Sequence, residues 1–395
     1  MVEPGVFTGW MEPRLPEYLD RLRALVNLDC GTDNKTGVDE VGRIFREYLR
    51  ASGATLEEFS LSQYGDCCLA TWRGRGKLRL LISGHLDTVY PQGTVAERPM
   101  KIEGNQALGP GVSDMKAGLL TGLYAVSALK AVGFDDYQEI KFFLNTDEEV
   151  DSPESKKIYQ PLAARVDAAL VLESARANGD IVSSRKGNAT YRVTVRGRQA
   201  HAGVEMEKGA NAIVELARII HDLTSLNQMH PGTTLNVGSI GGGTRSNVVP
   251  DYAWAEVDSR FLTFESGKAL DRAVKEVAKS ASVPGTQIEL SGGITKGPME
   301  KTTATGFLVE LAKRVGAQLG IHFDDVQTGG TSDGNFIGEL GIPTLDGLAP
   351  IGGRDHSPYE YLELDSIVPR TAILAGLIAS IAERREDLIA LRREV

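Results

Sequence analysis

Histidine and acidic side chains recur where predicted strands end, and the first such place is the segment 83–88. His85 and Asp87 follow the apolar run 78–82, which predicts a buried strand that opens into a loop at Gly84. Side chains two residues apart at such a junction can face one cleft. A histidine with a carboxylate close behind it is typical of a metal ligand and the group that orients it.

Four further candidate ligands lie at strand ends or loop starts: Asp114, Glu149, Glu173 and His356. Taken alone, Asp114 is better explained as a helix N-cap, and the pair Glu148-Glu149 as a solvated acidic turn. Glu173 follows the apolar run 168–172, where an unpaired charge would be unfavourable. His356 lies in a loop that is too rich in glycine to be core.

Together these residues indicate one site. Imidazole and carboxylate groups suit zinc, and two histidines with three carboxylates can hold two ions. One carboxylate would bridge the ions at about 3.5–4 Å, the usual spacing of two-metal hydrolytic sites. Glu148, beside Glu149, could take a proton from the metal-bound water and pass it to the leaving nitrogen.

The elements that must position these residues alternate in the first part of the chain. Predicted helices cover 15–26, 37–52 and 117–131, and short apolar strands cover 78–82, 140–145 and 168–172. Such alternation predicts a mainly parallel sheet covered on both faces. Ligands of such sheets gather at the carboxyl ends of the strands.

The pattern changes near Gly179. Strands are predicted at 191–196, 234–240, 252–260 and 288–290, with helices at 211–223 and 267–280. The first of these strands alternates as a strand with one solvated face does. We interpret this region as an inserted α+β unit. The α/β pattern resumes with helices at 305–319 and 334–340 and a final helix from Asp365 onward.

Composition narrows the class of protein. The 395 residues carry a net charge of −10 and are 42% hydrophobic, which predicts a soluble protein of about two domains and excludes non-specific nucleic-acid binding. Cys30, Cys67 and Cys68 do not form a disulfide framework and are expected to be free thiols.

The first 18 residues lack the apolar stretch of a signal peptide. The late apolar segment 372–382 is too short to span a bilayer and is expected to be a core helix. A cytoplasmic protein without a membrane partner is therefore predicted.

The chain resembles the dinuclear zinc metallopeptidase and deacylase family that includes bacterial glutamate carboxypeptidase, succinyl-diaminopimelate desuccinylase, acetylornithine deacetylase and aminoacylase, and is most similar to glutamate carboxypeptidase. The matching motifs occur in the family's order from about residue 15 to the end. They lie at 84–88, 109–118, 147–149, 199–203, 246–250, 328–333 and 355–357.

The resemblance implies the metal ligands. Asp114 would bridge two zinc ions per subunit, with cobalt or manganese as alternatives. His85 and Glu173 would complete one metal, and Glu149 with His356 the other.

The resemblance also implies roles next to the metals. Asp87 would orient His85, and Glu148 would be the general base and acid. His201 would polarise the scissile carbonyl with help from Asn247, although a lone histidine in a turn of small residues is usually structural.

The fold class implied is α/β: a zinc-exopeptidase-like, mainly parallel mixed sheet flanked by helices, with an inserted α+β lid and dimerisation domain. The expected boundaries are 1–185 and 296–395 for the two catalytic segments and 186–295 for the insertion. A homodimer through the inserted domain is expected, with His201 coming from either subunit.

Substrate-binding candidates follow from the expected free carboxylate. Arg260 would grip it in a bidentate manner, with a solvent-facing edge residue as the alternative explanation. Gly329, Gly330 and Thr331 would bring backbone donors close to it. Lys296 stands where glutamate-releasing relatives would have an anchoring arginine, which argues against a strict preference for C-terminal glutamate.

The function implied is hydrolysis of a peptide or N-acyl amide bond next to a free carboxylate, by a glutamate carboxypeptidase-like exopeptidase acting on a small peptide or N-acyl amino acid. The alternative is an N-acyl-amino-acid deacylase of the acetylornithine deacetylase or desuccinylase type. An inactive, metal-stabilised binding protein is the alternative from another class, and the presence of Glu148 argues against it.

Overall fold

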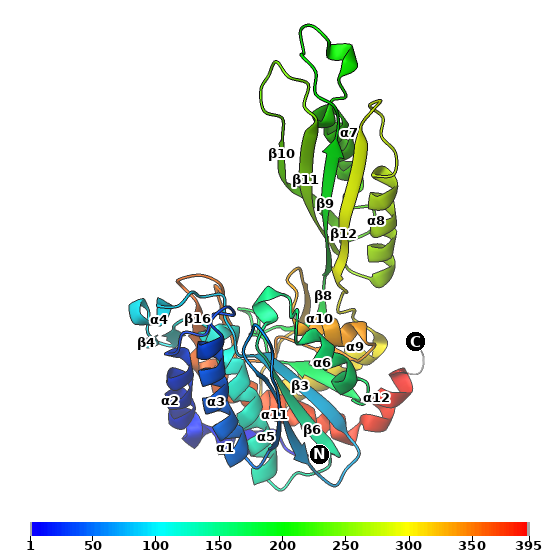
Figure 1. Ribbon diagram of the computed structural model, residues 1–395. Helices are drawn as coiled ribbons and strands as arrows, with labels where there is room; N and C mark the ends of the chain where they lie inside the picture. Colours follow the sequence, from blue (N-terminus) through cyan, green and yellow to red (C-terminus); the bar gives the residue numbers. More distant parts are fainter. Residues whose placement is uncertain (1, 393–395) are drawn as a thin grey trace. The chain divides into compact units, whose positions relative to one another are not determined.

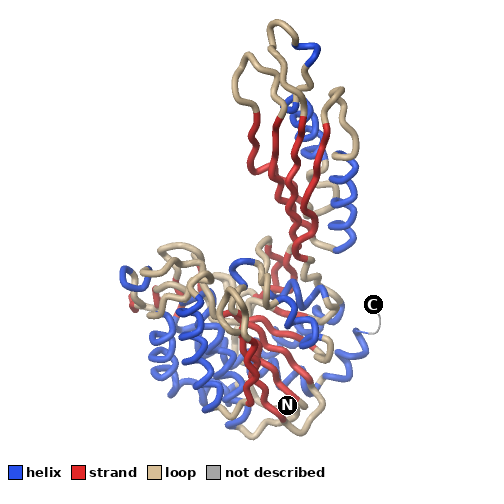
Figure 2. Tube along the Cα trace, viewed as in Figure 1, coloured by secondary structure: helices blue, strands red, loops and turns tan. Residues whose placement is uncertain are grey.

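The computed structural model describes residues 2–392, which divide into two compact units (Figures 1 and 2). Unit 1 contains the described residues up to Ser184, Lys301–Gln327, and the described residues from Ser332 onward. Unit 2 contains Arg185–Glu300 and Thr328–Thr331. The chain therefore leaves unit 1 twice to form unit 2, and returns to unit 1 each time.

A six-stranded sheet with the order β1-β2-β6-β3-β7-β14 forms the centre of unit 1. The strands are β1 (Thr55–Phe59), β2 (Cys67–Arg73), β3 (Arg79–His85), β6 (Glu139–Asn145), β7 (Ala168–Val171) and β14 (Thr344–Leu345). The last four are mutually parallel, whereas β1 pairs antiparallel with β2 and β2 antiparallel with β6. The expected mainly parallel mixed sheet is confirmed, and the antiparallel strands β1 and β2 are additions to it.

Successive residues of the central strands enter two different cores, as the two-residue period of a strand requires. On β3, Leu80 and Ile82 belong to the larger core, whereas Leu81 belongs to the smaller one. The larger core is covered by α1 (Gly5–Met11), α2 (Leu15–Val26), α3 (Lys35–Ala51), α5 (Ala117–Ala131), α9 (Thr303–Gln318), α11 (Ile367–Glu383) and α12 (Arg385–Arg392). The smaller core is covered by α6 (Lys156–Ala163) and α10 (Asp333–Glu339). Helices thus cover both faces of the sheet (Figure 1).

Helix α5 packs unusually close to the sheet. A Cβ atom added to Gly118 would lie 2.0 Å from the carbonyl oxygen of Leu172, at the carboxyl end of β7. The helix ends before Gly133, whose φ of 74° is the left-handed conformation that favours glycine. Because α5 contacts the end of β7 directly, it fixes the backbone from which Glu173 projects.

A small four-stranded sheet joins two distant parts of unit 1. Its strands have the order β15-β16-β5-β4, with bounds β15 (Gly352–Gly353), β16 (Tyr361–Glu363), β5 (Gln106–Leu108) and β4 (Lys101–Glu103). The short helix α4 (Thr94–Glu97) precedes it, and the pair β8 (Ile181–Arg185) and β13 (Asp325–Thr328) lies elsewhere in the chain. The small sheet brings the loop that follows β5 next to the loop that carries His356.

Unit 2 has a four-stranded antiparallel sheet with the order β10-β11-β9-β12. Its elements are β9 (Gly187–Arg196), α7 (Ala212–Ser225), β10 (Thr234–Gly242), β11 (Tyr252–Phe261), α8 (Phe264–Val277) and β12 (Gln287–Lys296). Both helices lie along the same face of the sheet (Figure 2). Asn211 caps α7 and Thr263 caps α8 through their side-chain oxygens. The expected inserted α+β unit is present.

Helix α11 is the late apolar segment of the sequence. Within the described residues, Leu364–Glu383 is the one helical stretch that is long and apolar enough to cross a bilayer, by length and composition only; it extends beyond the apolar segment 372–382 at both ends. However, 72% of its apolar window is buried inside the fold. The expected core helix is confirmed, because α11 packs against α5, α9 and α1.

Candidate metal centre

Three of the expected ligands come from neighbouring parallel strands. His85 ends β3, Glu149 lies in the 3₁₀ turn after β6, and Glu173 follows β7. Since β6, β3 and β7 are adjacent and parallel, their carboxyl ends meet at one edge of the sheet. The Nε2 atom of His85 lies 3.7 Å from a carboxylate oxygen of Glu173.

Asp114 lies between the two histidines. Its Oδ1 is 3.0 Å from Nε2 of His85, and its Oδ2 is 3.1 Å from Nε2 of His356. The same nitrogen of His356 is 3.2 Å from Oε2 of Glu149. Donor atoms of His85, Asp114 and Glu149 all lie within 4.8 Å of one another. The structure therefore brings all five expected ligands together, with each oxygen of Asp114 directed at a different histidine.

Asp114 does not cap helix α5. The helix begins at Ala117, its N-cap residue is Lys116, and no side chain accepts a capping hydrogen bond there. Asp114 has non-helical backbone angles in the preceding turn and is joined to Met115 by a cis peptide bond. The N-cap explanation of this aspartate is wrong, because both of its carboxylate oxygens are engaged by imidazoles.

The carboxylates and imidazoles strongly change one another's pKa. Burial raises the pKa of Glu173 well above its usual range, and the nearby charge of Asp114 adds to the effect. Hydrogen bonds to Asp114 and Glu149 raise the pKa of His356 to about 11. Burial opposes ionisation of Asp114, but hydrogen bonds from His356 and His85 outweigh it and lower the pKa of that carboxyl. The crowded carboxylates thus favour positive charge beside them.

Asp87 is fully buried behind His85. Its Oδ2 accepts hydrogen bonds from Oγ1 of Thr32 at 2.8 Å and from the backbone N–H of Glu149 at 3.2 Å. Nδ1 of His85 is 3.0 Å from the backbone oxygen of Asp87 and 3.4 Å from its carboxylate. The backbone oxygen is therefore the closer partner of the ring, while the carboxylate links the ring to the turn that carries Glu149.

Glu148 lies in the 3₁₀ turn Glu148–Val150, next to Glu149, and is half-buried. Its charge contributes to the raised pKa of Glu173, as expected of a group beside the cluster. The solvated acidic turn that the sequence alone favoured for this pair is wrong for Glu149, whose side chain is 6% exposed.

Glu360 was not singled out by the sequence. Its buried carboxylate accepts hydrogen bonds from the backbone N–H groups of Gly111, Ser113 and Asp114 at 2.8–3.0 Å. The hydroxyl of Tyr90 lies 2.8 Å from Oε2 of Glu360 and 2.9 Å from the backbone oxygen of Ser357. Burial raises the pKa of Glu360 to about 7. Glu360 and Tyr90 together join the loop that carries Asp114 to the loop that carries His356.

The remaining candidates lie in unit 2. His201 and Asn247 are exposed neighbours on two paired segments, since the N–H of Ala202 donates to the backbone oxygen of Asn247 at 3.0 Å. Arg260 lies near the end of β11, an inner strand of the sheet, and its side chain is 33% exposed. Its guanidinium makes two hydrogen bonds with Asp258, at 3.0 and 3.1 Å.

The segment with Gly329, Gly330 and Thr331 also belongs to unit 2. The backbone oxygen of Gly330 accepts a hydrogen bond from Nη1 of Arg185 at 3.1 Å. All three cysteines are free and buried, as expected, and burial raises the pKa of Cys68 to about 12.

Comparisons with known proteins place the chain among hydrolases. Residues 81–380 match the model of peptidase family M20/M25/M40. The chain is 30% identical over 373 residues to carboxypeptidase G2 of Pseudomonas sp. (strain RS-16), covering 92% of this chain and 89% of the relative. It is 30% identical over 311 residues to succinyl-diaminopimelate desuccinylase of Acidovorax ebreus (strain TPSY), covering 73% and 77%. Aminopeptidase PepT of Bacillus cereus ATCC 10987 has a similar fold, with a TM-score of 0.80, 24% identity and coverage of 93% and 99%.

Proposed function

The chain belongs to peptidase family M20/M25/M40, and from this premise we propose that it is a dizinc amidohydrolase, a glutamate carboxypeptidase-like exopeptidase. It would cleave a peptide or N-acyl amide bond next to a free carboxylate. The observation that carries the proposal is the position of Asp114, whose two oxygens contact His85 and His356 separately. A carboxylate with this arrangement is suited to bridge two ions.

The residues present fit two divalent cations. Asp114, Glu149 and Glu173 are crowded carboxylates, and the raised pKa of Glu173 shows how unfavourable a further negative charge is there without a cation. His85 and Glu173 would hold one ion, Glu149 and His356 the other, and Asp114 both. Nitrogen and oxygen ligands suit zinc, and also cobalt or manganese. Such ions lower the pKa of water and polarise a carbonyl.

The protein's own residues would then move the proton and hold the substrate. Glu148 takes a proton from the attacking water and gives it to the leaving nitrogen. Asp87 keeps His85 oriented. His201 and Asn247 donate to the oxygen of the scissile carbonyl as negative charge develops on it.

The free carboxylate of the substrate would bind to unit 2. Arg260 is the proposed bidentate partner, with Gly329, Gly330 and Thr331 supplying further donors. Since Arg260 already bonds to Asp258, the substrate carboxylate must compete with that aspartate. This competition would favour a substrate whose carboxylate can accept two hydrogen bonds from the guanidinium at once.

We further propose that the inserted domain, 186–295, pairs two subunits into a homodimer. Exposed apolar side chains support this, among them Ile213 and Val214 on α7 and Ile240 on the edge strand β10. Water-exposed apolar groups on an edge strand are a common interface feature. A cytoplasmic location is part of the same proposal.

A deacylase of the desuccinylase or acetylornithine deacetylase type is the second candidate, supported by the similarity to succinyl-diaminopimelate desuccinylase. A panel of peptides and N-acyl amino acids separates the two. Turnover of acyl amino acids without turnover of peptides would replace the carboxypeptidase assignment with the deacylase one.

The decisive test of the chemistry is Glu148→Gln. We expect this variant to bind two metals per subunit, by elemental analysis, and to lose at least about 100-fold in kcat. Hydrolysis at the parent rate would show that Glu148 is not the base. An unmodified protein that binds metal but hydrolyses no member of the panel would instead support a binding protein.

A further inference from the structure

The turn that follows β6 carries Glu148 and Glu149 and has a constrained backbone. Asp151 and Ser152, directly after its 3₁₀ part, have φ angles of 68° and 52°. These angles lie in the left-handed region that residues other than glycine rarely adopt. Such a backbone persists only where neighbouring groups hold it. The partners of this turn therefore decide where the two glutamates lie.

Asn145, the last residue of β6, holds both ends of the turn. Its side chain is fully buried, and its Oδ1 accepts hydrogen bonds from the backbone N–H groups of Thr146 at 2.7 Å and Asp147 at 3.3 Å. Its Nδ2 donates to Oγ of Ser152 at 2.9 Å. One amide side chain thus joins the first residue of the segment 146–152 to the last, and the two glutamates lie between them.

Asp333 is the buried acid that holds Asn145 and Ser152. It is 1% exposed, and both of its carboxylate oxygens lie 2.9 Å from Nδ2 of Asn145. Its Oδ1 also accepts a hydrogen bond from Oγ of Ser152 at 3.0 Å. The hydroxyl of Tyr159 donates to Oδ2, because burial and the charge of Asp333 raise the pKa of Tyr159 well above its usual range and keep it protonated. Two of these three donors belong to the turn that carries Glu148.

The carboxylate of Asp333 is directed at this turn and not at its own helix. Asp333 is the first residue of α10, but the cap of that helix is Ser332, whose Oγ accepts from the N–H of Gly334 at 3.0 Å. Asp333 also ends the sequence motif at 328–333, in which the proposed function uses residues 329–331 alone. A residue from the last part of unit 1 therefore holds a turn that lies almost 190 positions earlier in the chain.

We propose that Asp333 is a positioning residue of the proposed hydrolase. Through Asn145 and Ser152 it fixes the turn that carries the base Glu148 and the metal ligand Glu149. The inference rests on the proposed amidohydrolase function and adds a residue that acts through the turn. Misplacing a catalytic group by about 1 Å can lower a rate about 100-fold, so the support behind Glu148 contributes to the rate.

The test is Asp333→Asn, which keeps the size of the side chain but replaces one acceptor oxygen by an NH₂ group. In the full-length protein with saturating zinc, kcat for the best substrate of the panel should fall about 10-fold, with KM changed less than about 2-fold. Ser152→Ala removes one of the two links and should lower kcat about 3-fold or more. Ser152→Ala decides the question where Asp333→Asn does not fold. Parent-like kcat in folded variants would overturn the proposal.

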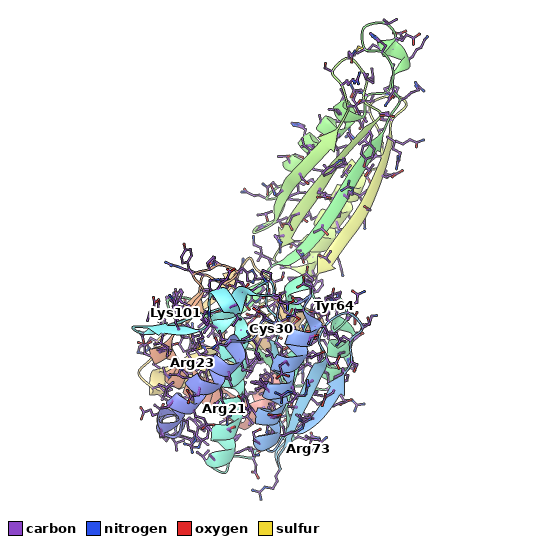
Figure 3. All side chains as sticks on the ribbon, turned by 60° about the vertical axis from the view of Figure 1, so that its left-hand side comes forward. Arg21, Arg23, Cys30, Tyr64, Arg73 and Lys101 are labelled. Carbon is purple, nitrogen blue, oxygen red and sulfur yellow. The ribbon has the colours of Figure 1, made fainter. Side chains whose placement is uncertain are left out.

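The matched control is Asp167→Asn. Asp167 is also a buried aspartate of unit 1, and it accepts hydrogen bonds from the N–H of Arg79 at 2.9 Å and from the guanidinium of Arg385 at 2.7 and 3.1 Å. Arg79 and Arg73 both pair with the first residue of β6, at the other end of that strand from the turn. Figure 3 shows Arg73 and Tyr64, which lie on either side of β2 in the sequence, at opposite edges of unit 1. Asp167→Asn should lower the free energy of unfolding and leave kcat unchanged.

A second experiment asks whether Asp333 acts through Glu148. In a Glu148→Gln background, Asp333→Asn should lower kcat by less than about 3-fold, because the base that it positions is gone. A full 10-fold loss in that background would overturn this role.

Zinc affinity separates a failure of the inference from a failure of the proposed function. If the parent hydrolyses no member of the panel, the proposed function fails, but the turn still carries the ligand Glu149. Chelator competition must then show that Asp333→Asn binds zinc about 10-fold more weakly than Asp167→Asn. Equal affinities would refute the positioning role.

Discussion

The carboxylate of Glu360 accepts a hydrogen bond from the backbone N–H of Asp114 at 3.0 Å. The same carboxylate accepts from Gly111 and Ser113, so one buried acid holds the whole turn before Asp114. Through Tyr90 it is also joined to the segment of Ser357. An acid that contacts neither histidine therefore sets the spacing between Asp114 and His356.

Replacing Glu360 by glutamine should weaken metal binding about 10–100-fold. A glutamine side chain has one acceptor oxygen and an NH₂ group, so it cannot accept from all three N–H groups. Chelator competition measures the affinity, and the far-ultraviolet spectrum of the metal-free variant reports whether the fold is kept. Glu363→Gln, three residues along, is the control. Parent-like affinity in a folded Glu360→Gln variant would show that the acid has only a structural role.

The stability of the metal-free protein should fall as pH rises above neutrality. The folded-state pKa of His356 is about 11, because Asp114 and Glu149 favour its charged form, whereas an unfolded histidine titrates near about 6.5. The charged His356 therefore contributes its full share to the free energy of unfolding below about pH 6.5. This stabilisation is lost as pH rises towards 11. Urea unfolding of chelator-treated parent and His356→Gln proteins at pH 7 and 9.5 checks this. The difference in the free energy of unfolding between the parent and the variant should be smaller at pH 9.5 than at pH 7. An equal difference at both pH values would contradict the raised pKa of His356.

Metal affinity should change in the opposite direction with pH. A protonated His356 already supplies positive charge between Asp114 and Glu149, so a cation must displace that proton to bind. The apparent affinity should increase between pH 6 and 8, and binding should release protons in a weakly buffered solution. Binding without proton release would show that His356 is neutral before the metal arrives.

Arg370→Met should destabilise unit 1 by at least about 3 kcal/mol. The buried guanidinium of Arg370 donates hydrogen bonds to the backbone oxygens of Ala349, Gly179 and Gly347, and burial lowers the pKa of Arg370 to about 10. Methionine would leave these oxygens without a donor. Arg384→Met, at the exposed end of the same helix, should change the free energy of unfolding by less than about 0.5 kcal/mol. Equal changes in the free energy of unfolding for the two substitutions would show that the three hydrogen bonds of Arg370 do not stabilise unit 1.

Ile240→Lys should convert the proposed homodimer into monomers. Ile240 is 63% exposed on the edge strand β10, and a charge there disfavours pairing of two edges. Sedimentation velocity measures the change, and Val6→Lys on α1 is a control at an exposed apolar position of unit 1. A dimer that persists in Ile240→Lys would place the interface elsewhere. If activity survives in true monomers, His201 acts within its own subunit.

Helices and strands with a regular apolar pattern were predictable from the sequence. The roles of side chains whose partners come from distant segments were not. The apolar run 78–82 predicted strand β3, and the repeating apolar positions of 211–223 and 267–280 predicted the helices of unit 2. Nothing local distinguishes Glu360 from a solvated acid, because its partners come from the loop at 111–114 and from Tyr90. Likewise, Asp114 resembles an N-cap until His356 approaches it, which requires the small sheet that joins β5 to β16.

The pairing of β14 with β7 spans the whole of unit 2, and this has a consequence for biosynthesis. While the ribosome is making residues 172–343, the edge of β7 has no neighbour on that side and can associate with other chains. His356 emerges later still, so no metal can be bound by all five ligands before the ribosome has passed residue 356. We therefore expect nascent chains, and chains truncated before residue 344, to depend on chaperones, with complete metal loading only after His356 has been made.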